Sequence, residues 1–366
     1  MKLQHLLAHL GTIAPLDLAA AWDNVGLLLG DPATDVRRVL TCLTVTPEVV
    51  DEATDQRADL IVTHHPILFN SVKRVTAANA EGRTVLTLAR FNVAVYSAHS
   101  AYDNAPGGIN DQLAALLQLT EVKPLHSVEQ RQCKIVVFTP DKDLAKVSSA
   151  LFAAGAGTIG PYNECSFRLA GTGTFFGTEG SNPTVGAKGR REDVSEWRLE
   201  VLCPQERVQE ALAAMRGAHS YEEPAYDVYP LQPGTSKAGE GRLGKLPRPT
   251  PLGELARTAG ERLHAAALTF VGDAARPVER MAIACGAGGS LLEDALTGGA
   301  EVFLTGEMRF HDCLRAQAQG AGVILPGHYA TERFAMEALA RSLQTQFPEL
   351  HVWASQRERD PLQSSQ

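Results

Sequence analysis

Short hydrophobic runs alternate with amphipathic stretches over the first third of the chain. The runs are rich in β-branched residues, which is typical of buried strands, and the stretches between them carry apolar residues at helical spacing. The expected strands are 38–46, 59–65 and 92–100, and the expected helices are 47–58, 84–91 and 107–119. This alternation predicts βαβ units and a parallel sheet.

The same alternation returns near the C-terminus. The expected strands there are 278–286, 300–307 and 321–328, and the expected helices are 288–299, 310–320 and 329–344. Aligning the two halves places 63–65 beside 305–307, and 98–103 beside 327–332. Ligands of open α/β sheets bind beyond the carboxyl ends of the strands, so a site is expected at these four stretches.

The middle of the chain follows a different order. Between residues 128 and 233 the expected elements run strand, helix, strand, strand, helix, strand, which is the ferredoxin-like βαββαβ pattern. Turn-rich segments flank it on both sides. The predicted fold class is therefore α/β: two similar βαβ-rich halves, 1–127 and 234–366, form one domain, and 128–233 is a small domain inserted into it.

Composition narrows the function. The chain has 366 residues, of which 44% are hydrophobic, and its formal net charge is −8. A globular protein with a substantial core is expected, without the basic surface that nucleic acids or anionic membranes require. The six cysteines are scattered and form no CxxC pair, and no apolar run is long enough for a spanning helix. These features favour the cytoplasm and give no support to a membrane role.

Two adjacent histidines, His64 and His65, end a greasy run. Neighbouring strand residues point to opposite faces, so the two imidazoles are expected to face different ions at the strand tip. Burying two imidazoles without partners would cost a few kcal/mol, which favours a metal or catalytic role over a core role. Two metal ions are the natural suggestion.

Two further pairs of candidate ligands lie four residues apart. His99 is followed by Asp103, and His328 is followed by Glu332 at the start of an amphipathic helix. A spacing of four puts both side chains on one helix face. Alone, each pair is most often an ordinary surface pair, but all the fragments fall at predicted strand tips. Imidazoles suit zinc, iron or nickel, and carboxylates add affinity for manganese or magnesium and can bridge two ions.

Two ions close together favour hydrolysis, because they activate water and polarise a substrate oxygen. Glu307 and His311 lie near another strand tip and are candidates for proton relay; the alternative is a helix N-terminal acid and a solvated histidine. The glycine loop at 286–289 either cradles an anion or is only a tight turn. His219, in the middle domain, is a candidate for ligand contact, but a partner interface or an ordinary surface position is favoured. The polar tail 355–366 is expected to be frayed.

Together these stretches resemble the Nif-three-like family of dinuclear-metal hexameric proteins, the GTP cyclohydrolase I type 2 homologues, over nearly the whole chain. The motifs that carry the resemblance are AAAWDNVGLLLG (19–30), THHPILF (63–69), AHSAYDNAPGGIND (98–111), CGAGGSLLEDAL (285–296), FLTGEMRFHD (303–312) and GHYATERF (327–334). The long members of the family carry an insertion similar to CutA and PII proteins. One departure is Thr44, where many relatives have an acidic residue.

The resemblance implies a ligand set for two divalent ions per subunit, of zinc, iron, manganese or nickel. The implied ligands are His64, His65, Asp103, His328 and Glu332, with His99 as a further ligand or a near neighbour. It also implies a toroidal homohexamer. The leading hypothesis is a hydrolase that acts on a nucleotide or pterin-like substrate through a metal-bound hydroxide, with His99, Glu307 or His311 moving protons. The alternative is a hexameric scaffold that stores or delivers metal, or a regulator, without catalysis.

Overall fold

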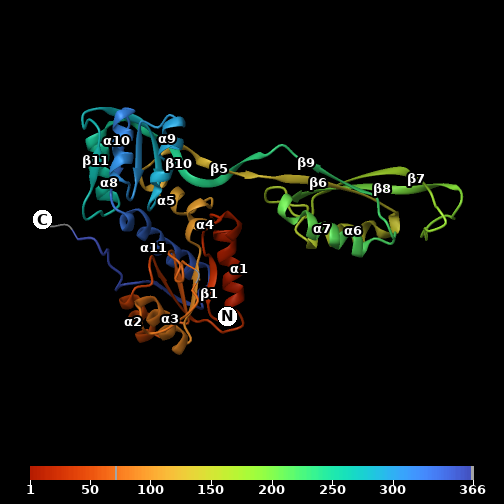
Figure 1. The fold of residues 1–366 in the computed structure, drawn as a ribbon, viewed down its shortest axis with the longest axis horizontal. Helices are drawn as coiled ribbons and strands as arrows, with labels where there is room; N and C mark the ends of the chain where they lie inside the picture. Colours follow the sequence, from red (N-terminus) through yellow and green to blue (C-terminus); the bar gives the residue numbers. More distant parts are fainter. Residues whose placement is uncertain (71, 364–366) are drawn as a thin grey trace. The chain divides into compact units, whose positions relative to one another are not determined.

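The computed structural model describes residues 1–70 and 72–363 and divides into two compact units (Figure 1). The first unit comprises Met1–Val128 and Ser236–Gln366, and the second comprises Glu129–Thr235. Among the described residues, no helix has the length and apolar character needed to cross a membrane.

The first sheet of the first unit has five strands in the order β1-β4-β3-β2-β15. The strand β15 comes from the C-terminal half of the sequence, and the other four strands come from the N-terminal half. The strands of this sheet are β1 (Gly26–Leu29), β2 (Arg38–Cys42), β3 (Leu60–Thr63), β4 (Ala94–Ser97) and β15 (His351–Ala354). Its helices are α1 (Leu3–Ile13), α2 (Pro47–Asp55), α3 (Ala80–Arg90), α4 (His99–Asn104) and α5 (Ile109–Leu116). β15, β2, β3 and β4 are parallel, and β1 is antiparallel to β4.

The second sheet has six strands in the order β11-β14-β13-β12-β10-β5. The strand β5 begins in the N-terminal half of the sequence, and the other five strands come from the C-terminal half. The strands of this sheet are β5 (Thr120–Gln130), β10 (Gly234–Pro251), β11 (Thr269–Val271), β12 (Pro277–Ala284), β13 (Val302–Thr305) and β14 (Gly322–Leu325). Its helices are α8 (Leu252–Arg262), α9 (Leu292–Thr297), α10 (Phe310–Ala318) and α11 (His328–Gln346). The series β11-β14-β13-β12 repeats the series β1-β4-β3-β2, which confirms the two similar halves; the antiparallel first pair, β1 with β4 and β11 with β14, was not predicted.

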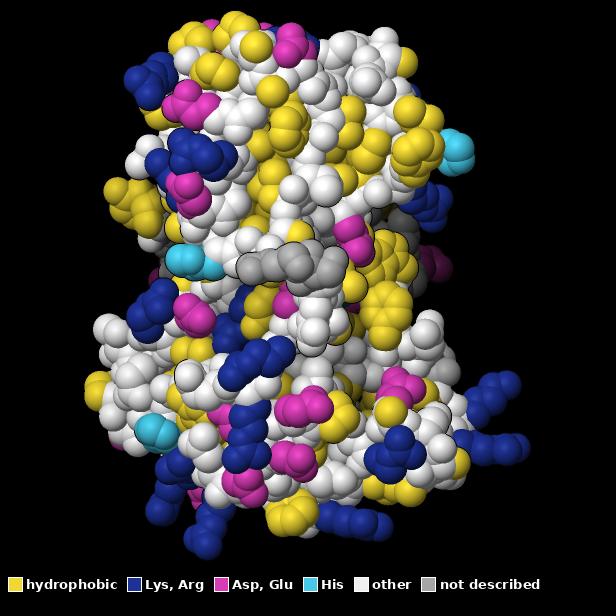
Figure 2. Space-filling model, turned by 90° about the vertical axis from the view of Figure 1, so that its left-hand side faces the viewer, with side chains coloured by type: hydrophobic (Ala, Val, Ile, Leu, Met, Phe, Trp, Pro, Cys, Tyr) yellow, Lys and Arg dark blue, Asp and Glu magenta, His cyan; other side chains and the backbone are white. Residues whose placement is uncertain are grey.

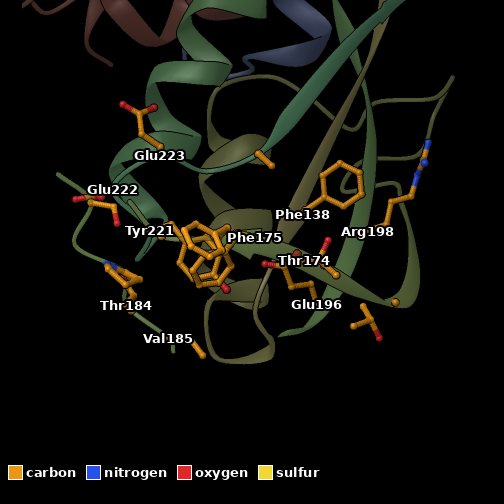
Figure 3. Close-up of a pocket in the computed structure, with 18 of the residues that line it drawn as sticks. Phe138, Thr174, Phe175, Thr184, Val185, Glu196, Arg198, Tyr221, Glu222 and Glu223 are labelled. Carbon is orange, nitrogen blue, oxygen red and sulfur yellow. The ribbon is translucent and has the colours of Figure 1, made fainter. Parts of the chain in front are cut away.

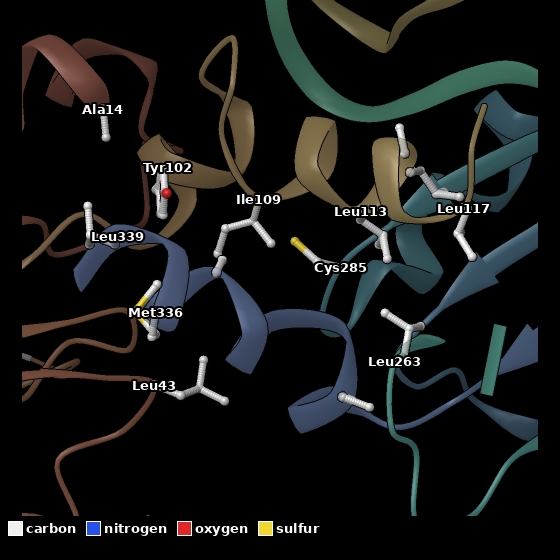
Figure 4. Packing of buried hydrophobic residues seen from close by; sticks show 14 of the residues in the cluster. Ala14, Leu43, Tyr102, Ile109, Leu113, Leu117, Leu263, Cys285, Met336 and Leu339 are labelled. Atoms are coloured by element: carbon white, nitrogen blue, oxygen red, sulfur yellow. The ribbon is translucent and has the colours of Figure 1, made fainter. Parts of the chain in front are cut away.

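Side-chain alternation gives each sheet two buried faces. In the first half, Leu40 and Ile61 pack under α2 and α3, whereas Leu60 and Val62 face α1 and α11. The inner faces of both sheets, with α1, α5, α8 and α11 between them, form one continuous core. Figure 4 shows part of this core, where Leu113 of α5 lies near Cys285 of the second half. This shared core fixes the two halves against each other.

The second unit has the predicted ferredoxin-like order. Its elements are β6 (Gln132–Thr139), α6 (Asp141–Ala153), β7 (Ser166–Phe176), β8 (Arg191–Pro204), α7 (Val208–Ala218) and β9 (Tyr226–Pro230). The sheet is antiparallel with the order β7-β8-β6-β9, and residues from α6 and α7 pack with β6 and β8 in a core of their own. The interpretation of 128–233 as βαββαβ is therefore correct.

The tail is not frayed where it begins. Glu52 of α2 accepts hydrogen bonds from the backbone N–H groups of Gln356 and Arg357 and from the Ser355 hydroxyl. Glu358 is buried and accepts the N–H groups of Leu43 and Thr44 at the end of β2. The expectation of a frayed tail is wrong for 355–358, because two carboxylates anchor it; residues 364–366 lie outside the described part.

Arg242 provides a test of the contact between the halves. Its guanidinium is 1% exposed and contacts Asp111 of α5 and the Ala105 and Gly239 carbonyls. Arg242→Met should lower the free energy of unfolding by about 3 kcal/mol, because it leaves these buried acceptors without a cation. Arg248→Met, at a side chain that is 79% exposed, is the matched control and should change it by less than about 0.5 kcal/mol. Equal midpoints for the two variants in urea unfolding would contradict this assignment.

Candidate metal centre

The carboxyl ends of strands from both halves meet at one place. β3 ends at Thr63, directly before His64 and His65, and Thr63 pairs with Ser97 at the end of β4. His99 opens α4 after β4, and His328 opens α11 after β14. α11 reaches the first sheet, where the Thr41 hydroxyl donates to the Met336 carbonyl (2.7 Å). Helix α11 therefore carries its first turn to the tips of β3 and β4.

His64, His65 and His99 form the first group of candidate ligands. One ring nitrogen of each lies within 4.8 Å of the others, and the His64 and His65 ring centroids are 5.1 Å apart. The two adjacent histidines therefore lie side by side. The expected strand 59–65 ends two residues earlier, at Thr63, so strand alternation does not set the directions of the two rings; the expectation that they face different ions stays a prediction.

His65, His328 and Glu332 form the second group, again within 4.8 Å. Glu332 Oε2 lies 3.1 Å from His65 Nε2 and 3.0 Å from His328 Nε2, one helical turn away. Burial alone would raise the pKa of Glu332, but the three neighbouring imidazoles hold it well below its usual value. The hydrogen bond to Glu332 raises the pKa of His328 to about 9. His65 belongs to both groups, so the groups are continuous.

His64 is the most deeply placed of these residues. Its side chain is fully buried, and neither ring nitrogen has a hydrogen-bond partner in the described structure. Burial lowers the pKa of His64 to about 3, so the ring is neutral. Its Nε2 lies 3.6 Å from Asp103 Oδ1 and 3.8 Å from Glu332 Oε1. A neutral imidazole with a free lone pair beside two carboxylates is a donor set that a divalent cation satisfies.

Asp103 reaches the same place from α4. Burial raises the pKa of Asp103 well above its usual value, and the nearby Glu332 carboxylate acts in the same direction. The Cys285 thiol donates to Asp103 Oδ1 (3.1 Å), and burial raises the pKa of this thiol. A carboxylate whose proton affinity is raised by burial and by a second carboxylate favours a bound cation between the two. These residues therefore fit a metal ion by charge as well as by ligand type.

Three histidines of the cluster have a partner on the nitrogen that faces away from it. Thr44 Oγ1 lies 2.7 Å from His65 Nδ1, Asp23 Oδ1 lies 2.8 Å from His99 Nδ1, and Glu307 Oε1 lies 3.0 Å from His328 Nδ1. Such partners fix the tautomer and the orientation of metal-binding imidazoles. Each pairing leaves Nε2 directed to the shared centre.

Asp23 and Cys285 contact the cluster, but neither is among the candidate residues that the sequence predicts. Asp23 is itself held by Ser100, whose backbone N–H and hydroxyl both donate to Oδ2. Both residues lie inside quoted motifs, WDN and CGAGG, but neither has a spacing signal because their partners are distant in the chain. Thr44, noted as a departure, takes the position of an outer partner to His65.

The glycine loop serves close packing. A side chain at Gly286 (φ +58°) would clash with Glu332 Oε1, and one at Gly306 would come within 2.7 Å of His328 Cα. The N–H groups of Gly286 and Gly288 already donate to the hydroxyls of Thr331 and Thr305. These contacts favour the tight-turn interpretation over anion binding, because the amides are already engaged.

The two candidates for proton relay, Glu307 and His311, lie in different places. Glu307 is exposed and touches His328, so it lies at the edge of the cluster. His311 is exposed on α10, and its ring packs against that of Phe310 (5.8 Å). None of its contacts in the described part of the chain reaches the cluster, because α10 carries it away from the strand tips.

Gly286→Ala tests the close packing. The variant should weaken divalent-metal affinity by at least about tenfold, because the added methyl group displaces Glu332 and the left-handed backbone is unfavourable for alanine. The measurement is metal retained against a competing chelator, for zinc and manganese separately. Gly11→Ala in α1, where the methyl group meets no atom within 4 Å, is the control. Unchanged affinity in Gly286→Ala would show that Glu332 does not need this space.

Comparisons with known proteins agree over nearly the whole chain. The family model described as Duf34/NIF3 (NGG1p interacting factor 3) matches residues 1–361. A Bacillus subtilis protein named "GTP cyclohydrolase 1 type 2 homolog" is 35% identical, covering 93% of this chain and 91% of the relative. A Mycobacterium bovis protein of the same name is 37% identical, covering 91% and 88%.

Solved structures agree as well. A Bacillus cereus protein related to NIF3 has a TM-score of 0.83 at 34% identity, covering 100% of this chain and 99% of the other. The Staphylococcus aureus protein SA1388 has a TM-score of 0.81 at 28% identity, with the same coverage. The fold, the cluster at the strand tips and these matches together show that the chain belongs to the Duf34/NIF3 family.

Proposed function

We propose that this protein is a dinuclear metal-dependent hydrolase that acts on a nucleotide or pterin-like molecule. The observation that carries the proposal is the set of outer hydrogen bonds: Thr44, Asp23 and Glu307 each hold one histidine so that its Nε2 faces the shared centre. Surface histidines rarely have such matched support, whereas metal-binding histidines almost always do. The names of the relatives point to the same class of small-molecule chemistry.

The proposed ligands divide between two neighbouring ions. His64 and Asp103 would hold one, His65 and His328 the other, and Glu332 lies near both sets. Divalent ions so placed would supply activated water and polarise a substrate oxygen. His99 lies beside both adjacent histidines, with Asp23 on its other nitrogen, so it is placed to bind an ion or to hold a proton at Nε2. Glu307, at the exposed edge, holds His328 at Nδ1 and can exchange protons with solvent directly.

Two exposed aromatic rings flank the cluster and favour a planar substrate. Trp22 is 64% exposed and Phe69 is 47% exposed, although both lie beside a buried site. Their ring centroids are 5.9 Å apart, and they lie 5.9 Å and 6.2 Å from the His99 ring. The Asn24 side chain donates to the Leu68 carbonyl (2.8 Å), which holds the two loops together. Rings exposed in this way can stack on a base or a pterin.

A metal-binding scaffold without catalysis is the second candidate. The observation that favours it is the depth of His64 and Glu332, whose side chains are almost fully buried. Deep ligands suit tight storage as well as catalysis, and only a catalytic site must keep an open coordination position. The two candidates therefore differ in turnover and not in metal content.

Metal-loaded wild type should hydrolyse at least one member of a panel of nucleotides and pterin-like compounds, tested in turn with zinc, iron, manganese and nickel. His65→Ala and Glu332→Ala should lower turnover at least about a hundredfold, because each removes a ligand. The turnover of Asp23→Asn should lie between that of these variants and that of wild type. His126→Ala, at an exposed histidine that contacts only Glu240 among the described ion pairs, is the control. If the metal-loaded wild type turns over no compound faster than the variants do, the hydrolase proposal fails and the metal-binding scaffold is the remaining candidate.

Trp22→Ala should raise KM about tenfold and change kcat by less than about twofold, because stacking on a base contributes about 1–3 kcal/mol to binding and not to bond cleavage. Steady-state kinetics with the substrate found in the panel gives both constants. Phe91→Ala, at an aromatic residue that is 60% exposed after α3, is the matched control. A fall in kcat at constant KM would assign Trp22 to the reaction itself.

A further inference from the structure

The second unit contains a cavity of about 530 Å³ that is separate from the candidate metal centre. It lies on the face of the sheet opposite α6 and α7. Val137 and Leu199 pack in the core with the helices, so Phe138 and Arg198, one residue along each strand, point to the other face. Arg168 of β7 reaches Ser148 of α6, so Gly171 and Phe175 also belong to the opposite face. These four residues line the cavity.

Four aromatic residues line it, and Figure 3 labels three of them: Phe138, Phe175 and Tyr221. His219 connects two of them, because its Nε2 lies 3.1 Å from the Phe138 carbonyl and its Nδ1 accepts the Tyr221 N–H (3.0 Å). His219 is 8% exposed, so the expectation that it lies at a surface or partner interface is wrong for this unit. The histidine is a structural brace that places Tyr221 over the sheet.

A loop closes one side of the cavity. The Asn182 N–H donates to Glu222 (2.7 Å), and the Thr184 hydroxyl donates to the Ser220 carbonyl (2.7 Å). These bonds fasten the segment after β7 to the segment after α7. The hollow therefore has a fixed wall and is more than an uncovered sheet face.

The polar groups of the cavity are mostly anionic. Glu196, Glu222 and Glu223 line it, and none of them has an ion-pair partner among the described residues. Arg198, the one lining cation, is bound to Glu200 (2.9 Å). Gly173 lets Glu196 lie across β7, since a side chain there would clash with the Glu196 carboxylate.

Tyr221 adds a polar group beside the rings. Burial raises the pKa of Tyr221 to about 12, and a hydrogen bond to the Glu196 carboxylate acts in the same direction. The Tyr221 hydroxyl and the Glu196 carboxylate therefore form a polar edge next to the aromatic wall.

We propose that this cavity binds a small organic cation with an apolar or aromatic body, such as a quaternary ammonium or an aryl amine. Aromatic faces attract cations through their quadrupoles, and three unpaired carboxylates at the same hollow add to this attraction. The volume lies within the range of small-molecule sites. An anion would meet three carboxylates and only one cation that is already paired, so the charge selects against it.

The experiment uses phenyltrimethylammonium as the probe and the full chain as the protein, with calorimetric titration as the readout. Wild type should bind this cation, and benzenesulfonate, of similar size and opposite charge, should not bind. Gly171→Leu should abolish binding, because nothing lies within 4 Å of a Cβ at Gly171 and the new side chain fills the hollow without strain on the strand. Glu196→Gln should weaken binding at least about fivefold, since it removes the charge nearest the rings.

Two controls separate this site from general attraction to an acidic protein. Gly217→Leu, on α7 outside the cavity, also meets nothing within 4 Å and should bind as wild type does. Glu206→Gln removes one exposed charge outside the cavity and should have no effect. Equal binding by wild type and Gly171→Leu would overturn the proposal, and so would equal binding of the cation and the sulfonate. Metal content is unaffected in either case, so the result is independent of the proposed hydrolase.

Discussion

One carboxylate, that of Glu332, links the residues of the candidate centre. Glu332 lies within 4 Å of His64, His65 and His328, and its own side chain is almost completely buried. A buried carboxylate is costly unless positive charge or donors surround it, and here the imidazoles supply them from two halves of the chain. The close turn at Gly286 exists because the Glu332 oxygen occupies the space of a side chain. Glu332 therefore adds a polar contact between α11 and the residues after β3, beside the apolar core that packs α11 between the two sheets.

Support for the centre extends far along the chain. Glu358, in the tail, holds the Thr44 amide, and the Thr44 hydroxyl holds His65. The Glu358 carboxylate also lies 2.8 Å from Arg333, directly after Glu332 on α11. The tail thus connects the first sheet to α11, the helix that carries the candidate ligands His328 and Glu332. Glu358 is buried, so its carboxylate holds the Thr44 backbone in place beside His65.

The fold was largely readable from the sequence, and so was the main cluster. Periodicity gave the two βαβ-rich halves and the inserted βαββαβ unit, because strands and helices leave local patterns. The spacing of His328 and Glu332 gave one helix face for the same reason. Asp23 and Cys285 had no such signal, since they meet His99 and Asp103 only after folding. Strand alternation does not orient His64 and His65, because β3 ends at Thr63, two residues before the expected end of the strand.

The duplication explains both the likeness and the asymmetry of the centre. His99 and His328 hold equivalent positions after β4 and β14, and each is bonded through Nδ1 to an acidic partner, Asp23 or Glu307. At the other pair of equivalent strand tips, the residue that corresponds to His64 is Gly306. Any side chain at Gly306 would clash with His328. A side chain at 306 would also clash with the Gly286 carbonyl and the Thr331 hydroxyl, so the second half has no room for an equivalent of His64. The two halves therefore contribute unequally to one cluster of candidate ligands.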